Sequence, residues 1–94
     1  MEKINTMRYV AMTTKGKPLF IQAEQKAINS QGLTKVVYKL TEDLLDASKT
    51  LNHISAKTLI QDYTAATQST KDFAVRSVAT TFELLEESDE DGGN

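Results

Sequence analysis

The sequence predicts an α+β fold in which a small antiparallel β-sheet comes first and helices from the second half of the chain cover it. β-Branched and aromatic residues gather in short runs within residues 7–40, which is typical of strands. Apolar residues recur at helical spacing over residues 42–87, which predicts helices with one buried face. A chain of 94 residues supports one modest core, so we expect a single domain over 1–87 and an acidic, disordered tail over 88–94.

The first two strands are expected to form a β-hairpin. Residues 8–14 and 19–23 are apolar runs separated by residues 15–18, where a glycine gives the backbone freedom of a turn. The proline of that turn begins the second strand, where a missing N–H does little harm. The same proline is also suited to the first turn of a helix. Residues 18–31 therefore have an alternative helical interpretation, in which the protein is an all-α helical hairpin or bundle.

A third strand and two helices are expected to follow. Residues 34–40 alternate between apolar and polar side chains, which indicates a strand with one buried face. Thr41 precedes two acidic residues, a combination that favours the start of a helix. Residues 56–87 are predicted to form a second, long helix. Because residues 67–72 are polar, the pattern leaves open whether this stretch is one helix or two.

Composition excludes several classes of function. The chain has no cysteine, so disulfides and thiolate chemistry are excluded, and a metal site would depend on His53 and carboxylates. We expect no metal, no cofactor and no enzymatic activity, because a lone histidine at a predicted helix end is more typical of a dipole partner than of a catalytic base. No apolar run is long enough for a membrane span or a secretory signal, so we expect a cytoplasmic protein of the producing or host cell.

Charge is divided unevenly along the chain. Residues 1–39 carry seven basic and two acidic residues, a net charge of +5, whereas residues 40–94 carry four basic and eleven acidic residues, a net charge of −7. Such asymmetry indicates a surface for nucleic acid, an acidic segment that docks on a partner, or attraction between the two halves. The candidate partner-binding acids are Glu83, Glu86, Glu87, Asp89, Glu90 and Asp91.

Two further surfaces are candidates for binding. A long last helix would extend past a small sheet, and its apolar stripe would then pair with a second copy or another protein. The residues of this stripe are Ala74, Val78, Phe82 and Leu85. If Val10 and Met12 face the helices, the opposite face of the sheet combines rings with ammonium groups, as single-stranded nucleic-acid binders do. That candidate face consists of Tyr9, Lys15, Lys17, Phe20, Lys35 and Lys39.

These observations favour a non-enzymatic protein that binds another protein and forms a homodimer. In its size, its lack of cysteine and its lack of catalytic residues, the chain resembles many small bacterial or bacteriophage accessory and inhibitor proteins, although no motif identifies a family. The specific hypothesis is an inhibitor of a host nucleic-acid-processing protein. The alternatives are a single-stranded nucleic-acid-binding module and a phage structural or assembly subunit.

Overall fold

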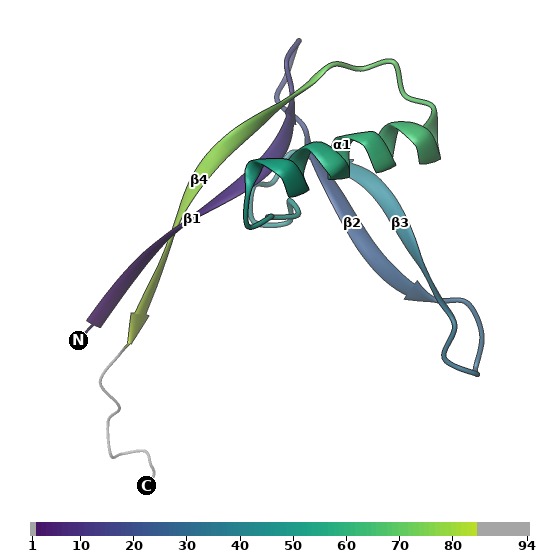
Figure 1. Cartoon of the computed structure of the whole chain (residues 1–94), viewed down its shortest axis with the longest axis horizontal. Coiled ribbons are helices and arrows are strands. Elements are labelled where there is room, and N and C mark those ends of the chain that lie inside the picture. Colours follow the sequence, from purple (N-terminus) through teal and green to yellow (C-terminus); the bar gives the residue numbers. More distant parts are fainter. Residues whose placement is uncertain (1, 85–94) are drawn as a thin grey trace, which may run out of the picture.

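The structure is a computed structural model that describes residues 2–84 (Figure 1). In this part of the chain a four-stranded antiparallel sheet with strand order β3-β2-β1-β4 is accompanied by one helix. The elements, in chain order, are β1 (Glu2–Thr13), β2 (Phe20–Ala27), β3 (Thr34–Thr41), α1 (His53–Thr67) and β4 (Phe73–Leu84). The α+β class and the antiparallel sheet are confirmed. No helix of the described residues is long and apolar enough to cross a membrane.

The prediction of a long last helix is wrong, because its second half is strand β4. Ala74, Val78 and Phe82 are four residues apart, and this spacing keeps residues on one face of a helix and also on one face of a strand. The neighbouring β-branched residues, among them Val75 and Thr80, favour the strand. The all-α alternative finds no support, since residues 20–27 form strand β2.

The helix expected after Thr41 is also absent, and the chain makes tight turns there instead. The Thr41 hydroxyl accepts a hydrogen bond from the N–H of Asp43 (3.1 Å), and the Asp43 carboxylate accepts one from the N–H of Leu45 (2.9 Å). Both side chains therefore bond an amide only two residues ahead, which stabilises a turn in competition with a helix. The Lys49 ammonium group closes the turn by donating to three of its carbonyls at 2.8–3.1 Å.

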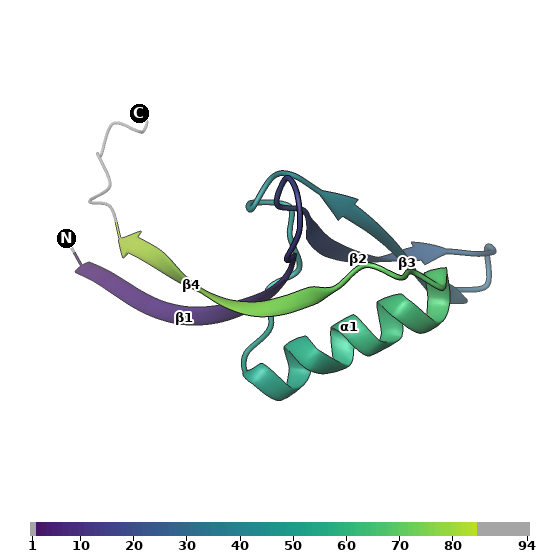
Figure 2. The same ribbon diagram turned by 90° about the horizontal axis from the view of Figure 1, so that it is seen from above.

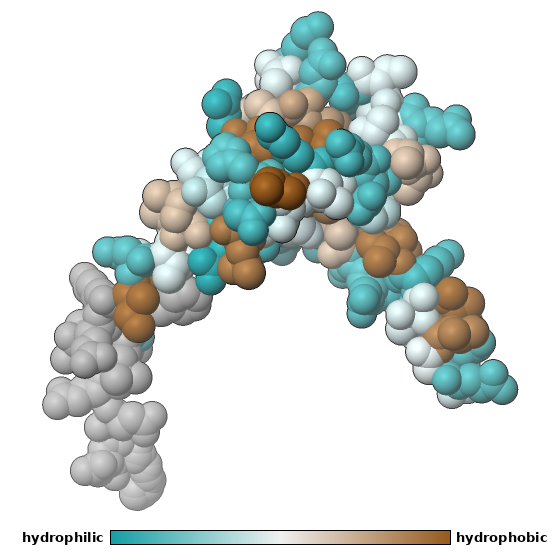
Figure 3. All heavy atoms as spheres, in the orientation of Figure 1, coloured by the Kyte–Doolittle hydropathy of each residue, from teal (hydrophilic) through white to brown (hydrophobic). Residues whose placement is uncertain are grey.

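The sheet divides into two ribbons that meet at one end. β1 and β4 pair along twelve positions, and β2 and β3 pair along eight. Between β1 and β2, however, the only paired position is Met12 with Phe20. The β1–β4 ribbon and the β2–β3 ribbon consequently diverge from this point, and we call the gap between them the fork (Figures 1 and 3). Gly16, with a φ of 72°, forms the turn that joins β1 to β2, in agreement with the glycine turn expected there.

The segment from Ser48 to Thr50, which we call the bridging segment, connects the two ribbons at the base of the fork. Thr50 exchanges two backbone hydrogen bonds with Tyr9 of β1, at 2.8 and 2.9 Å. Ser48 donates its N–H to the carbonyl of Ile21 on β2 (3.0 Å), and its hydroxyl accepts from the N–H of Ala23 (2.8 Å). The bridging segment therefore supplies backbone partners where β1 and β2 have separated too far to pair with each other.

α1 packs across the point where the ribbons meet, on one side of the sheet (Figure 2). Its residue Tyr63 is buried in a cluster with Ala11 of β1 and Ile21 of β2. The Tyr63 ring also meets Tyr38 and Phe73 edge-on, with ring centroids 6.2 and 5.4 Å apart. One helical side chain thus contacts both ribbons. The buried apolar residues of the described chain are few and lie near this point: Val10, Ala11, Ile21, Ala47, Ala56 and Tyr63.

Candidate interaction surface

The inner edge of β1, which borders the fork, presents backbone groups that no described strand pairs with. In an antiparallel ladder, alternate residues direct both their N–H and their C=O toward the same neighbouring strand. Tyr9 directs both groups away from β4, toward Thr50. Asn5 and Met7 have the same parity and therefore direct their groups into the fork, where no described strand pairs with them. The one described contact on this edge is local, from the Arg8 guanidinium group to the Met7 carbonyl (3.1 Å).

The inner edge of β2 has the same character. Ile21 and Ala23 bond the bridging segment with backbone groups that point away from β3. Gln25 and Ala27 share their parity, so their N–H and C=O groups also point into the fork. Two facing strand edges without described partners therefore border one open gap. An exposed strand edge is a template on which another chain can add a strand.

Exposed apolar side chains accompany these edges. The ribbons extend beyond the part of the sheet that α1 covers, and apolar residues lie along both of them (Figure 3). Met7 is 51% exposed and belongs to the face of β1 that carries Ala11, the face toward α1. Val36, 44% exposed, shares the corresponding face of the other ribbon with Tyr38. The exposed large apolar residues of the two ribbons are Ile4 and Met7, and Ile28 with Val36 and the adjoining Leu33.

Only some residues of the predicted nucleic-acid face lie on one face of the sheet in the structure. The register of β2 and β3 places Phe20, Lys35 and Lys39 on one face, the face away from α1. Tyr9 lies on the opposite face of the sheet, where its ring packs against His53 with centroids 4.6 Å apart. Lys26 pairs directly with Lys35 and belongs to this face as well. Sequence reasoning missed Lys26 because it expected the second strand to end at Ala23.

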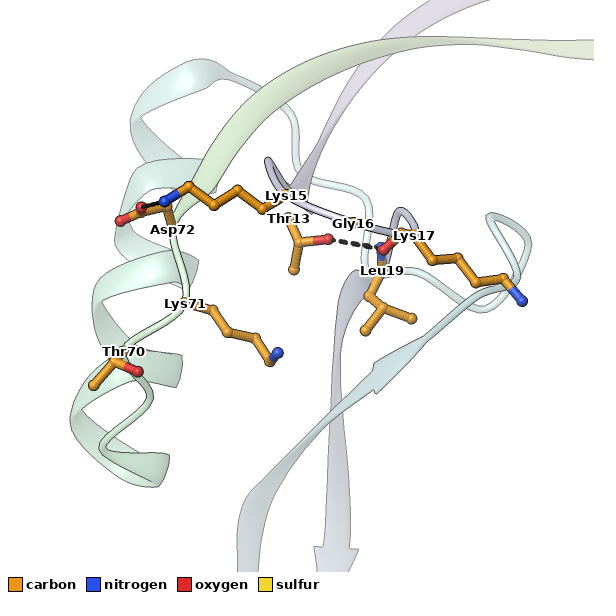
Figure 4. Close-up of a pocket in the computed structure, with 8 residues that line it drawn as sticks. All are labelled: Thr13, Lys15, Gly16, Lys17, Leu19, Thr70, Lys71 and Asp72. Carbon is orange, nitrogen blue, oxygen red and sulfur yellow. Dashed lines mark hydrogen bonds and ion pairs between the residues drawn. The ribbon is translucent and has the colours of Figure 1, made fainter.

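Lys15 and Lys17 lie away from that face, beside a pocket of about 450 Å³ between the β1–β2 turn and the connection from α1 to β4. Lys15 pairs with Asp72 (3.8 Å) and Lys17 pairs with Glu42 (2.9 Å). Figure 4 shows Lys15 reaching toward Asp72, while Lys17 extends away from it. Both ion pairs join the basic first half of the chain to the acidic second half. Some of the basic residues of the first half therefore form ion pairs with acidic residues of the second half within the same molecule. The ammonium groups of Lys15 and Lys17 beside this pocket are both paired in this way.

His53 begins α1 rather than ending a helix, since Asn52 is the N-cap and accepts a hydrogen bond from the N–H of Ser55 (2.8 Å). The expected position of His53 at a helix C-terminus is therefore wrong. The described residues contain no group of three or more His, Asp or Glu side chains that could hold a metal ion.

The remaining candidates lie on β4 or beyond it. Ala74 and Val78 share one face of β4, and Phe82 has the same parity. The expected helical stripe is therefore wrong for these three residues. Glu83 is exposed and lies opposite Lys3 in the register. The other predicted site residues lie outside the described part of the chain: Leu85, Glu86, Glu87, Asp89, Glu90 and Asp91.

No protein-family model matches the chain, and no curated protein or solved structure is significantly similar to it. The functional argument therefore depends on the geometry of the fork and of the two ribbons.

Proposed function

We propose that the chain is a non-enzymatic protein-binding protein that accepts an extended segment of another polypeptide in the fork. The observation that carries this proposal is the inner edge of β1, whose backbone groups at Asn5 and Met7 have no described strand partner. Added strands bind through such main-chain groups, and side chains beside the edge supply specificity. The exposed side chain of Met7, on β1 itself, is placed for that second role.

The energetics of the ribbons support the same function. A two-stranded ribbon is marginally stable in water, and stable sheets need a third strand or a packed face. Beyond the part covered by α1, each ribbon has two strands and exposed apolar residues. A strand added in the fork would pair the free edge of β1 and pack beside the exposed side chain of Met7. Binding to another protein is thus retained from the sequence hypothesis, while the contact surface moves from the last helix to the fork. The role as a bacterial or phage accessory or inhibitor protein stays a prediction.

Replacing Asn5 by proline should weaken partner binding while preserving the fold. Proline removes the N–H that points into the fork, and the N–H groups that pair β1 with β4 belong to residues of the other parity. The matched control, Asn5→Ala, keeps that N–H. Proteins retained from a host lysate by the immobilised wild type should be purified and their dissociation constants measured for each variant. We expect at least about tenfold weaker binding for Asn5→Pro alone.

Circular dichroism of both variants checks that the sheet is intact. Equal affinity of the purified partner for wild type and a folded Asn5→Pro variant would rule out strand addition at this edge.

A second function is favoured by one observation, the direct pairing of Lys26 with Lys35, which the Glu24 carboxylate, 4.0 Å from the Lys26 ammonium group on the same face, offsets only for Lys26. Like charges opposite each other destabilise a sheet, and an anionic ligand on that face would relieve the repulsion. Phe20 and Lys39 share the face and would supply stacking and a further phosphate contact.

Fluorescence polarisation with a single-stranded oligonucleotide across a salt series tests this second function. Phosphate contacts predict a linear fall of log affinity with log salt, and the double variant Lys35→Glu, Lys39→Glu should bind at least about tenfold more weakly. The control Lys57→Glu changes a lysine on α1. Affinity independent of salt, or equally weakened by the control, would argue against this function.

A further inference from the structure

We propose that the segment that fills the fork is strand β1 of a second copy of this chain, paired antiparallel with β1 about a two-fold axis at Asn5. This inference rests on the proposed function, because it names the partner of the same edge. In the resulting dimer the two ribbons would join into one sheet with the central order β4-β1-β1-β4.

The limits of the free edge determine the register. The edge begins at Glu2, where β1 begins, and ends at Arg8, because Tyr9 is already bonded to Thr50. A self-pairing that uses the whole edge must place its midpoint, Asn5, opposite itself. Asn5 directs both its N–H and its C=O into the fork, so two copies of Asn5 can exchange two hydrogen bonds across the axis. A two-fold axis requires this symmetry of the central pair.

Charge favours the same register. With Asn5 opposite itself, position 2 of each copy stands opposite position 8 of the other, and the sequence has an acid, Glu2, at one position and a base, Arg8, at the other. These are non-hydrogen-bonded positions, at which opposing residues approach most closely. A midpoint at Ile4 would leave Met7 unpaired, and a midpoint at Thr6 would require groups of Tyr9 that Thr50 occupies.

The strand directions are compatible with mutual insertion. β1 of the second copy runs antiparallel to β1, so the attached β4 of that copy runs antiparallel to β2 across the fork. Each fork can therefore receive the β1–β4 ribbon of the other copy without reversing a strand. The pairing replaces two marginal two-stranded ribbons by one four-stranded sheet, which exceeds the three strands that a stable sheet needs.

A single cysteine tests the position of the axis. The chain has no cysteine, so an Asn5→Cys variant can form a disulfide only with another copy. A hydrogen-bonded antiparallel pair places the two Cα atoms about 5.5 Å apart, within the range of disulfides. Under mild oxidation at micromolar concentration we expect Asn5→Cys to become a covalent dimer. The control Ser77→Cys, on the exposed part of β4, should remain mostly monomeric; equal cross-linking of both would overturn the proposal.

Charge reversal tests the register. Sedimentation equilibrium should show that Arg8→Glu raises the dimer dissociation constant about tenfold, because two attractive pairs become repulsive. The double variant Glu2→Arg, Arg8→Glu should return it to within about threefold of wild type, which general damage to the fold would not allow. Failure of the double variant to restore dimerisation would overturn this register.

Different results would reject the dimer and the proposed function. If the wild type is monomeric at every concentration, a second copy is not the partner. If Asn5→Pro then fails to bind a different protein that the wild type binds, strand addition in the fork is still supported. If Asn5→Pro dimerises as well as the wild type, the pairing of β1 with β1 is wrong. If that variant also binds every other partner as tightly as the wild type does, the proposed function is wrong as well.

Discussion

Replacing Tyr63 by alanine should lower the free energy of unfolding by about 3–5 kcal/mol, a large part of the stability of a small domain. Tyr63 is 7% exposed and is the buried residue that α1 contributes to the cluster with Ala11 and Ile21, against which Leu59 and Ile60 of α1 also pack. Its ring also meets Tyr38 of the β2–β3 ribbon and Phe73 of the β1–β4 ribbon. The truncation would leave a cavity at the point where the ribbons meet, and few other buried side chains could compensate.

Urea denaturation followed by circular dichroism measures this loss. The matched control is Tyr63→Phe, which keeps both ring contacts and removes only the hydroxyl, and we expect its stability within about 1 kcal/mol of wild type. A Tyr63→Ala protein as stable as the control would contradict the role of this ring in holding the ribbons together.

Replacing Ser48 by alanine should destabilise the fold by about 1–3 kcal/mol, because the Ala23 N–H loses its partner in a partly buried position. The Ser48 hydroxyl holds the bridging segment to β2 by accepting from this N–H and donating to the Ala23 carbonyl (3.4 Å). Its loss should also loosen the connection between the two ribbons. Hydrogen exchange at the Ala23 amide should therefore accelerate along with the fall in stability.

The matched control for this variant is Ser69→Ala. Ser69 also accepts a backbone N–H, that of Lys71 (3.1 Å), but the bond is exposed, so water can replace it. We expect the control to change stability by less than about 0.5 kcal/mol. Equal effects of the two substitutions would show that the bridging segment contributes no more than an ordinary surface turn.

The existence of the first three strands could be predicted because local signals agree there, but their lengths could not, since β1 begins at Glu2 rather than residue 8 and β2 ends at Ala27 rather than residue 23. A glycine turn separates the first two apolar runs, and residues 34–40 alternate as a half-buried strand should. The side of β1 that faces α1 could not be predicted, and the choice of Val10 and Met12 was wrong. Val10 and Ala11 are both nearly inaccessible to solvent, so both sides of the strand are covered at this point and alternation carries no information.

The second half of the chain was harder to predict because its signals are ambiguous. A four-residue apolar spacing fits β4 and a helix equally well, and only pairing with β1 decides between them. In the same way, the residues expected to cap a helix after Thr41 form turns through local bonds, and these turns lead into the bridging segment, which bonds β1 and β2. Both outcomes depend on contacts with distant strands, which no local pattern reports.

The fork itself could not be predicted from the sequence. It exists because β1 and β2 separate after the single pair of Met12 with Phe20, and that separation is a property of the whole sheet. The residues of the inner edge, such as Asn5, are ordinary strand residues in the sequence. Of the predicted nucleic-acid face, alternation along β3 places Lys35 and Lys39 on one side, and the register of β2 with β3 adds Phe20 to that side; binding of nucleic acid by this face stays a prediction.

The pairing of the first strand with the last has a consequence for biosynthesis. β1 leaves the ribosome before the other described elements, yet twelve of its positions pair with β4, the last of these elements in chain order, and only Met12 pairs with β2. The β2–β3 hairpin closes a short loop and can form early, whereas β1 must wait for a contact about seventy residues away. Until β4 is made, the nascent chain therefore carries an open β-strand, so chaperone dependence and aggregation of newly made protein should concentrate in β1.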